Sequence, residues 1–249
     1  MLTDQLPFVL LVLGTFCVAY LVAAIGPTGG LQLAVTSVTL PAQYVIPVHA
    51  WISAVSAAFR VTALRQSVDW RFVCIFALPS VLATGLAILI GNFAGYHWIK
   101  ILIGLHIIAD GLGLLAFPGA VALFSRGSRP EIAGAVTGFV TAFIGASGPL
   151  LWSLMKDRFP ERVALSATHS ACLIIQHMSK ILLFGVIGLS ILEFWPLLIA
   201  TTAASLIGTW LGQRKLRRFD EKTYRRLLNI ALVASGIVIV TLGILALRT

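Results

Sequence analysis

Apolar runs long enough to cross a membrane constrain this chain more than any other feature of its sequence. The first covers residues 6–25, and comparable runs recur as far as residues 226–247. A helix needs about 20 such residues to cross the roughly 30 Å hydrocarbon core of a bilayer. Hydrophobic residues make up 59% of the chain and charged residues only 11%, which is outside the range of soluble globular domains. The sequence therefore predicts an all-α integral membrane protein with the lipid bilayer as its surroundings.

The net charge of +9 does not indicate a nucleic-acid partner. The basic residues lie mostly in the short connections between the apolar runs, where cytoplasmic loops of membrane proteins carry Lys and Arg. Cys17, Cys74 and Cys172 lie far apart within apolar runs, whereas metal and redox motifs group their cysteines closely. We therefore expect three buried thiols, no metal and no cofactor.

Two clusters of helix-breaking residues interrupt the apolar runs. Residues 26–30 read Gly-Pro-Thr-Gly-Gly, and residues 145–149, which begin 119 positions later, read Gly-Ala-Ser-Gly-Pro. Glycine adopts backbone angles closed to other residues, and proline stops a helix. Within a bilayer, a broken backbone is tolerated only where protein or a water-filled cavity satisfies its polar groups. Matching breaks in two halves are the sequence pattern typical of a transporter's binding site.

Other residues repeat in the same order. His49 and Arg60 correspond to His169 and Lys180, which follow 120 positions later. In both pairs the basic residue comes eleven positions after the histidine, about three helical turns, so the two side chains share one face. The shared order predicts an internal duplication.

The distribution of Lys and Arg decides between two topologies. If each cluster only kinks a helix, the chain has eight spans and the loop Lys and Arg divide eleven to five between the two sides. If each short segment turns back as a hairpin, there are ten helical elements and the division becomes fourteen to two. The positive-inside rule favours the hairpins. The fold we expect is a helical bundle of two inverted repeats, residues 1–120 and 121–249, each a broken helix or hairpin plus three spans, with both termini outside.

These features resemble the sulfite exporter TauE/SafE family, also called toluenesulfonate uptake permeases. The resemblance covers nearly the whole chain and is carried mainly by residues 24–65 and 143–185, which contain the glycine-rich break, the short segment to a proline and the polar helix. It implies transport of a small anion, often sulfite or an organosulfonate, across the bacterial inner membrane, with proton coupling. The chain has Pro, Thr, Ala and Ser among its glycines, a departure that bears on the substrate rather than the fold.

The short segments that follow the breaks predict an anion site. The first turn of a helix offers free N–H groups and a partial positive charge. The alternative is that the small residues only allow close helix packing. The expected substrate-binding residues at the breaks are Gly26, Thr28, Gly29, Gly30, Gly145, Ser147 and Gly148; the hydroxyls of Thr28 and Ser147 either bind the anion or cap the helices.

Four polar side chains in the spans are further candidates for the substrate site. An unpaired charge near the bilayer centre costs at least ~2.5–3.5 kcal/mol, so Arg60 and Lys180 need a role or must extend to the membrane surface. His49 and His169 either bind the anion, carry a proton or serve only the structure.

Proton coupling has a candidate of its own. Asp110 is the acidic residue near the middle of a span, and His106 lies one turn before it, so the two can form a proton relay or simply neutralise each other. The competing functions are an intramembrane enzyme that uses these His and Asp residues, and a permease subunit of a larger complex. The substrate, the direction of transport, the coupling ion and the oligomeric state, including a homodimer, stay open.

Overall fold

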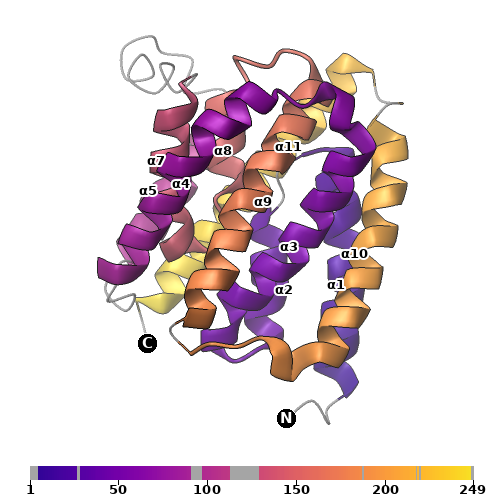
Figure 1. Cartoon of the computed structure of the whole chain (residues 1–249). Helices are drawn as coiled ribbons and strands as arrows, with labels where there is room; N and C mark the ends of the chain where they lie inside the picture. The colour runs from indigo at the N-terminus through magenta and orange to yellow at the C-terminus, as the bar shows by residue number, and fades with distance from the viewer. Residues whose placement is uncertain are drawn as a thin grey trace.

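The computed structural model describes residues 5–26, 29–90, 97–112, 129–186, 188–216, 218 and 220–247. Within these residues the chain is helical throughout, without a strand (Figure 1). The ten α-helices are α1 Gln5–Ala24, α2 Gly29–Thr39, α3 Ala42–Leu64, α4 Trp70–Ile90, α5 His97–Gly111, α7 Pro130–Ile144, α8 Gly148–Met155, α9 Arg162–Val186, α10 Trp195–Leu216 and α11 Glu221–Ala246. Two short 3-10 turns, Arg65–Ser67 and Leu192–Phe194, precede α4 and α10.

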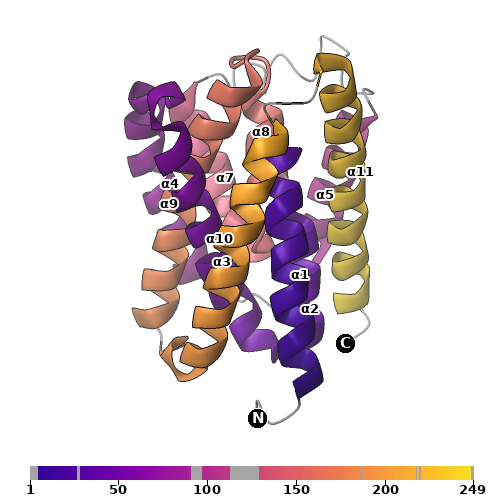
Figure 2. The same ribbon diagram turned by 90° about the vertical axis from the view of Figure 1, so that its right-hand side faces the viewer.

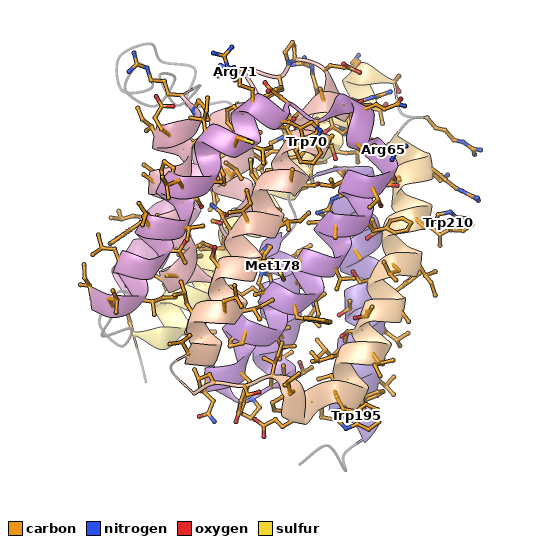
Figure 3. All side chains as sticks on the ribbon, viewed as in Figure 1. Arg65, Trp70, Arg71, Met178, Trp195 and Trp210 are labelled. Atoms are coloured by element: carbon orange, nitrogen blue, oxygen red, sulfur yellow. The ribbon has the colours of Figure 1, made fainter. Side chains whose placement is uncertain are left out.

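The surface of this bundle is apolar. Among the described residues, six helices are long and apolar enough to cross a membrane: α1, α3, α4, α9, α10 and α11. Large apolar side chains such as Trp195 (62% exposed) and Trp210 (44% exposed) cover the outside (Figure 3). Leu89 is 87% exposed and Leu182 is 69% exposed, while many hydroxyl and amide side chains are buried. A soluble protein arranges these groups the other way round. The predicted all-α multi-pass membrane protein is confirmed.

The first broken helix is a hairpin. Gln32 Nε2 donates a hydrogen bond of 3.1 Å to Thr15 Oγ1, although 17 helical residues in a straight line would separate them by about 25 Å. A β-carbon added to Gly14 would touch the side chain of Val35, so α2 runs back along α1. Figures 1 and 2 show both termini at one end of the bundle, and the α3–α4, α8–α9 and α10–α11 connections at the other. This is the ten-element arrangement rather than the eight kinked spans.

The helices pair in a pattern that is unchanged when the two halves are exchanged. The most extensive packing joins α1 to α10, α4 to α7, α5 to α11 and α3 to α9. In a duplicated chain α1 corresponds to α7, α3 to α9, α4 to α10 and α5 to α11. Exchanging the halves therefore turns the α1–α10 pair into the α7–α4 pair. The α3–α9 and α5–α11 pairs each join two corresponding helices and stay the same. The inverted orientation of the repeats and their boundary near residue 120 stay predictions.

Glycines on two of these interfaces allow the backbones to touch. Gly134 and Gly138 of α7 face backbone carbonyls of α4, and Gly208 and Gly212 of α10 face backbone carbonyls of α1. A β-carbon at any of the four positions would collide with a carbonyl oxygen. Small residues four apart are the usual means of close helix approach where the hydrophobic effect is absent.

One prediction about the periphery was wrong. The last apolar run was placed at residues 226–247, but its helix, α11, already begins at Glu221, and α10 before it continues to Leu216. Asp220 caps the start of α11: its Oδ1 accepts a 2.9 Å bond from the Thr223 N–H. Hydrogen bonds from Thr223 also hold the pKa of the Asp220 carboxyl below its ordinary value.

The thiols were also predicted incorrectly in part. Cys172 is buried as expected, but Cys17 and Cys74 are exposed. The reason is that a lipid-facing surface is as apolar as a protein interior, so an apolar run alone does not distinguish the two.

The glycine contacts predict a stability difference. Gly138→Ala places a methyl group against the Ser80 carbonyl of α4, and we expect it to lower the midpoint of thermal unfolding in detergent by about 5 °C. The matched control is Gly85→Ala, because no atom lies within 4 Å of its added β-carbon, and its midpoint should stay the same or rise slightly. Equal midpoints for the two variants would contradict the close crossing of α4 and α7.

Candidate anion-binding site

The two helix breaks meet inside the protein. A β-carbon added to Gly29, the first residue of α2, would lie 3.9 Å from Cβ of Ala146, two residues before α8. A β-carbon added to Gly145 would lie 3.0 Å from Leu33 Cδ1 of α2. All residues from 141 to 150 are buried. Gly26 and Gly145 have φ of 127° and 81°, values that favour glycine, so the chain can reverse at both points.

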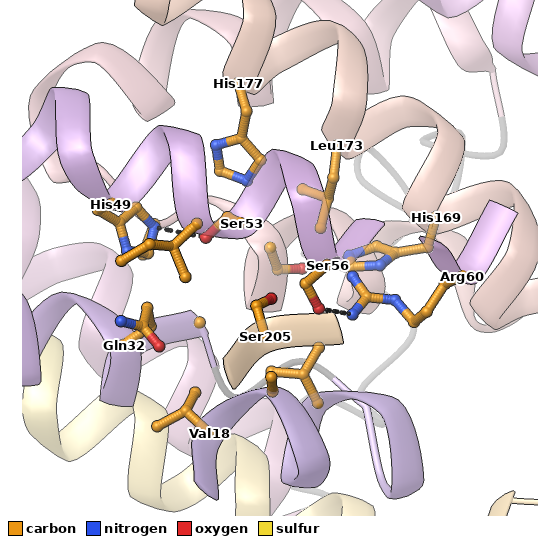
Figure 4. Close-up of a pocket in the computed structure, with 16 residues that line it drawn as sticks. Val18, Gln32, His49, Ser53, Ser56, Arg60, His169, Leu173, His177 and Ser205 are labelled. Carbon is orange, nitrogen blue, oxygen red and sulfur yellow. Dashed lines mark hydrogen bonds between the residues drawn. The ribbon is translucent and has the colours of Figure 1, made fainter. Parts of the chain in front are cut away.

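A cavity lies beside these breaks (Figure 4). Its volume is about 40 Å³, enough for about three water molecules or one compact ion. Residues of α1, α2, α3, α8, α9 and α10 line it, and none of them is acidic. Its polar and charged lining consists of Gln32, His49, Ser53, Ser56, Arg60, His169, His177 and Ser205.

Arg60 brings a positive charge to the cavity wall. It projects from α3 and is only 2% exposed. Its Nε donates to Ser170 Oγ at 2.8 Å, and one terminal nitrogen donates to Ser56 Oγ at 2.7 Å. These bonds use two of the five guanidinium N–H groups. Arg60 therefore does not extend to the membrane surface. No carboxylate among the described residues pairs with it, and a buried cation without such a partner is costly.

Lys180 is buried as well, but its charge is directed elsewhere. It is 0% exposed and absent from the cavity lining. Its Nζ donates a 2.7 Å hydrogen bond to the Gly145 carbonyl, at the C-terminal end of α7. The negative end of a helix dipole stabilises a positive charge there. The two basic residues that the duplication pairs therefore occupy different environments in this structure.

Three histidines line the cavity. His169 Nε2 donates to the Gly148 carbonyl at 2.9 Å, and its ring packs edge-on against Trp152 with centroids 4.9 Å apart. The rings of His49 and His177 meet edge to face with centroids 5.7 Å apart. His49 Nε2 lies 3.4 Å from Ser53 Oγ, while Nδ1 of both His49 and His177 has no hydrogen-bond partner within the described part of the chain.

Four glycines of the breaks fall into two groups, those that line the cavity and those that pack against other helices. Gly29 and Gly148 line the cavity, and a β-carbon at either would have only ordinary contacts beyond 3.7 Å. Gly26 and Gly30 are buried behind it against α11, where a β-carbon on Gly30 would lie 3.0 Å from the Ser235 carbonyl oxygen. The binding interpretation therefore suits Gly29 and Gly148, and close packing explains Gly26 and Gly30.

Ser147 neither lines the cavity nor caps α8 with its side chain. Its Oγ donates to Gln176 Oε1 at 2.8 Å, and Gln176 Nε2 donates in turn to Thr137 Oγ1 at 2.7 Å. The hydroxyl is used to hold α9 against the break. Thr28 and the side chains of His106 and Asp110 lie outside the described residues.

The site residues predicted from the sequence did not include five of the polar lining residues: Gln32, Ser53, Ser56, His177 and Ser205. Each is a polar residue within an apolar run, and this is the signal that could have identified them. His177 was only a weaker candidate in the sequence, and the residue 120 positions before it is Ala57.

Comparison with known proteins identified one family. Its sequence profile, described as sulfite exporter TauE/SafE, matches residues 11–239, nearly the whole chain. The comparisons with curated proteins and with solved structures found no match.

The geometry predicts that Arg60 determines affinity for anions. Arg60→Gln removes the cation and its remaining donors from the cavity wall, so we expect the affinity for a small oxyanion to fall about 10- to 100-fold, the range for a charge-assisted hydrogen bond. Isothermal titration calorimetry on purified protein measures it. The control is Arg71→Gln, which removes one charge from an exposed position and should bind normally. Equal affinities in both variants would remove Arg60 from the site.

Proposed function

This chain belongs to the sulfite exporter TauE/SafE family, and from that premise we propose that it transports a small anion, sulfite or an organosulfur anion, through the cavity in Figure 4. The family is one of membrane transporters of sulfite and related anions, and the helical bundle with its apolar surface fits that role. This favours transport over an intramembrane enzyme or a permease subunit of a larger complex.

One observation supports an anion in particular: a buried guanidinium borders a cavity with no acidic lining residue. Among the described residues, the hydrogen-bond partners of Arg60 are the hydroxyls of Ser56 and Ser170, and the first residues of α2 and α8, Gly29 and Gly148, open onto the same space. Helix N-termini favour negative charge, and the unpartnered Nδ1 atoms of His49 and His177 are the second sign that a ligand belongs there.

For the mechanism we propose alternating access between two arrangements of the repeats. In this structure Arg60 lines the cavity while its counterpart Lys180 is bonded to the carbonyl of Gly145. If the repeats exchange arrangements, as inverted repeats do, Lys180 becomes the residue that faces the anion and Arg60 turns to the break at Gly26. The two cations would then act in turn on opposite sides of the barrier.

For the cellular setting we propose the bacterial inner membrane, with the basic connections in the cytoplasm. The exposed side chains of Arg65 and Arg71 lie at the end of the bundle opposite to Trp195 and to both termini (Figures 1 and 3), as the positive-inside rule requires. A proton relay through His106 and Asp110 and a homodimer stay expectations of the sequence.

The proposed substrate class predicts selective stabilisation. A ligand at 100 times its Kd adds about 2.7 kcal/mol to the stability of the folded state, so a thermal-shift panel of sulfite, sulfate, thiosulfate, taurine, sulfoacetate and simple carboxylates should rank the sulfur anions highest. Gly29→Leu and Gly148→Leu fill the cavity and should abolish both the shift and uptake into proteoliposomes. Gly185→Leu is the control, because no atom lies within 4 Å of its added β-carbon. Normal flux in both cavity variants would overturn the proposed site.

The orientation has its own test. Both ends of the chain lie opposite to the basic connections (Figure 1), so tags fused to either end should report a periplasmic location in intact cells, and a tag inserted after Arg158 a cytoplasmic one. Reporter pairs that are active on only one side of the membrane measure this. A cytoplasmic terminus would reverse the proposed orientation.

A further inference from the structure

Two histidines in the cavity have a property that anion binding by Arg60 does not explain. His49 is 1% exposed and His177 is 3% exposed, and Nδ1 of each has no hydrogen-bond partner among the residues that the structure describes. Buried polar atoms almost always have a partner, and leaving one without costs about 1–3 kcal/mol. The two rings touch edge to face, with centroids 5.7 Å apart, and both line the cavity. We call them the His49–His177 pair.

The charges around the pair are all basic. Arg60 on α3 and His169 on α9 share the cavity lining, and Lys180 follows His177 by three residues on α9. The lining residues contributed by α1, α2, α8 and α10 include no titratable side chain. Like charges in a medium of low dielectric constant repel strongly, so an additional proton is unfavourable while the cavity holds no anion.

A bound anion makes an additional proton in the cavity favourable. Arg60 supplies one positive charge at the cavity wall, whereas the charge of Lys180 is already opposed by the C-terminal end of α7 at Gly145. A monoanion is matched by Arg60 alone. A dianion leaves one negative charge in excess, and the imidazoles are the nearest groups that change charge near neutral pH.

We propose that the His49–His177 pair takes up one proton with each dianion bound, so that the site carries a sulfur dianion together with a proton. This rests on the proposed function and names the coupled ion. The proton comes from solvent to Nδ1 of either ring; for His49, Nε2 is already beside Ser53 Oγ, which leaves Nδ1 to gain it. The uptake stops at one proton because two imidazolium rings at this separation repel each other.

Calorimetry in two buffers with different ionisation enthalpies counts the protons directly. Thiosulfate is the probe, since it stays a dianion from pH 6 to pH 8, and sulfate replaces it if it binds more tightly. The wild-type protein should take up about one proton per anion, and wherever it does so its affinity should fall about tenfold per pH unit, as linkage requires. In the double variant His49→Gln/His177→Gln the uptake should drop to near zero and the pH dependence should flatten, whereas each single variant keeps one ring that takes up the proton. Uptake of one proton by the double variant would overturn the proposal.

Two further variants make the test specific. His169→Gln should weaken binding but keep the uptake of one proton, because the Nε2 of His169 is engaged with the Gly148 carbonyl. Asp110→Asn should also keep it, whereas loss of proton uptake in Asp110→Asn alone would move the coupling to that residue and overturn the proposal. Anion binding without proton uptake in the wild type overturns this inference only. Absence of binding by any dianion overturns the proposed function as well.

Discussion

The constraint on which the rest of this structure depends is that an interrupted helix cannot face hydrocarbon. The free N–H and C=O groups at each break must find partners within the protein. Here the two breaks satisfy this by meeting each other: Gly29 packs on Ala146, and Gly145 on Leu33. The first turns of α2 and α8 are thereby brought to one buried place, and their N-termini open onto the same cavity. The position of the candidate site therefore follows from the place inside the protein where the two helix breaks meet.

The two buried cations, Lys180 and Arg60, differ in how the protein compensates their charge. Lys180 is stabilised by the carbonyl end of α7, so its charge is already opposed within the protein. The partners of Arg60 in the described part of the chain are the hydroxyls of Ser56 and Ser170, which solvate a guanidinium without neutralising it. The positive charge of Arg60 is therefore left to be balanced by a negatively charged solute. Under the proposed alternating-access mechanism this difference has a further consequence, because Arg60 and Lys180 would face the anion in turn.

The interior and the exterior of the bundle use apolar residues differently. Inside, glycines such as Gly138 and Gly208 bring helix backbones into contact, since close packing replaces the hydrophobic effect as the source of helix association in lipid. Outside, large side chains such as Leu89 meet the acyl chains. Hydropathy is equal on the two sides, and for this reason the exposure of Cys17 and Cys74 was not predictable from their apolar surroundings.

The sequence by itself determined the membrane-embedded helical class, the family, the two breaks and the candidate residues Arg60, His49 and His169, because run length, Gly/Pro clusters and charges inside apolar runs are local signals. Only the tertiary structure decided that Arg60 lines the cavity while Lys180 binds Gly145, that Ser147 bonds to Gln176, and that His177 joins His49. These outcomes depend on which helices cross and at what depth. The contacts that result join residues 29 positions apart for Ser147 and Gln176, 35 for Gly145 and Lys180, and more than a hundred for His49 and His177, and no local pattern encodes them.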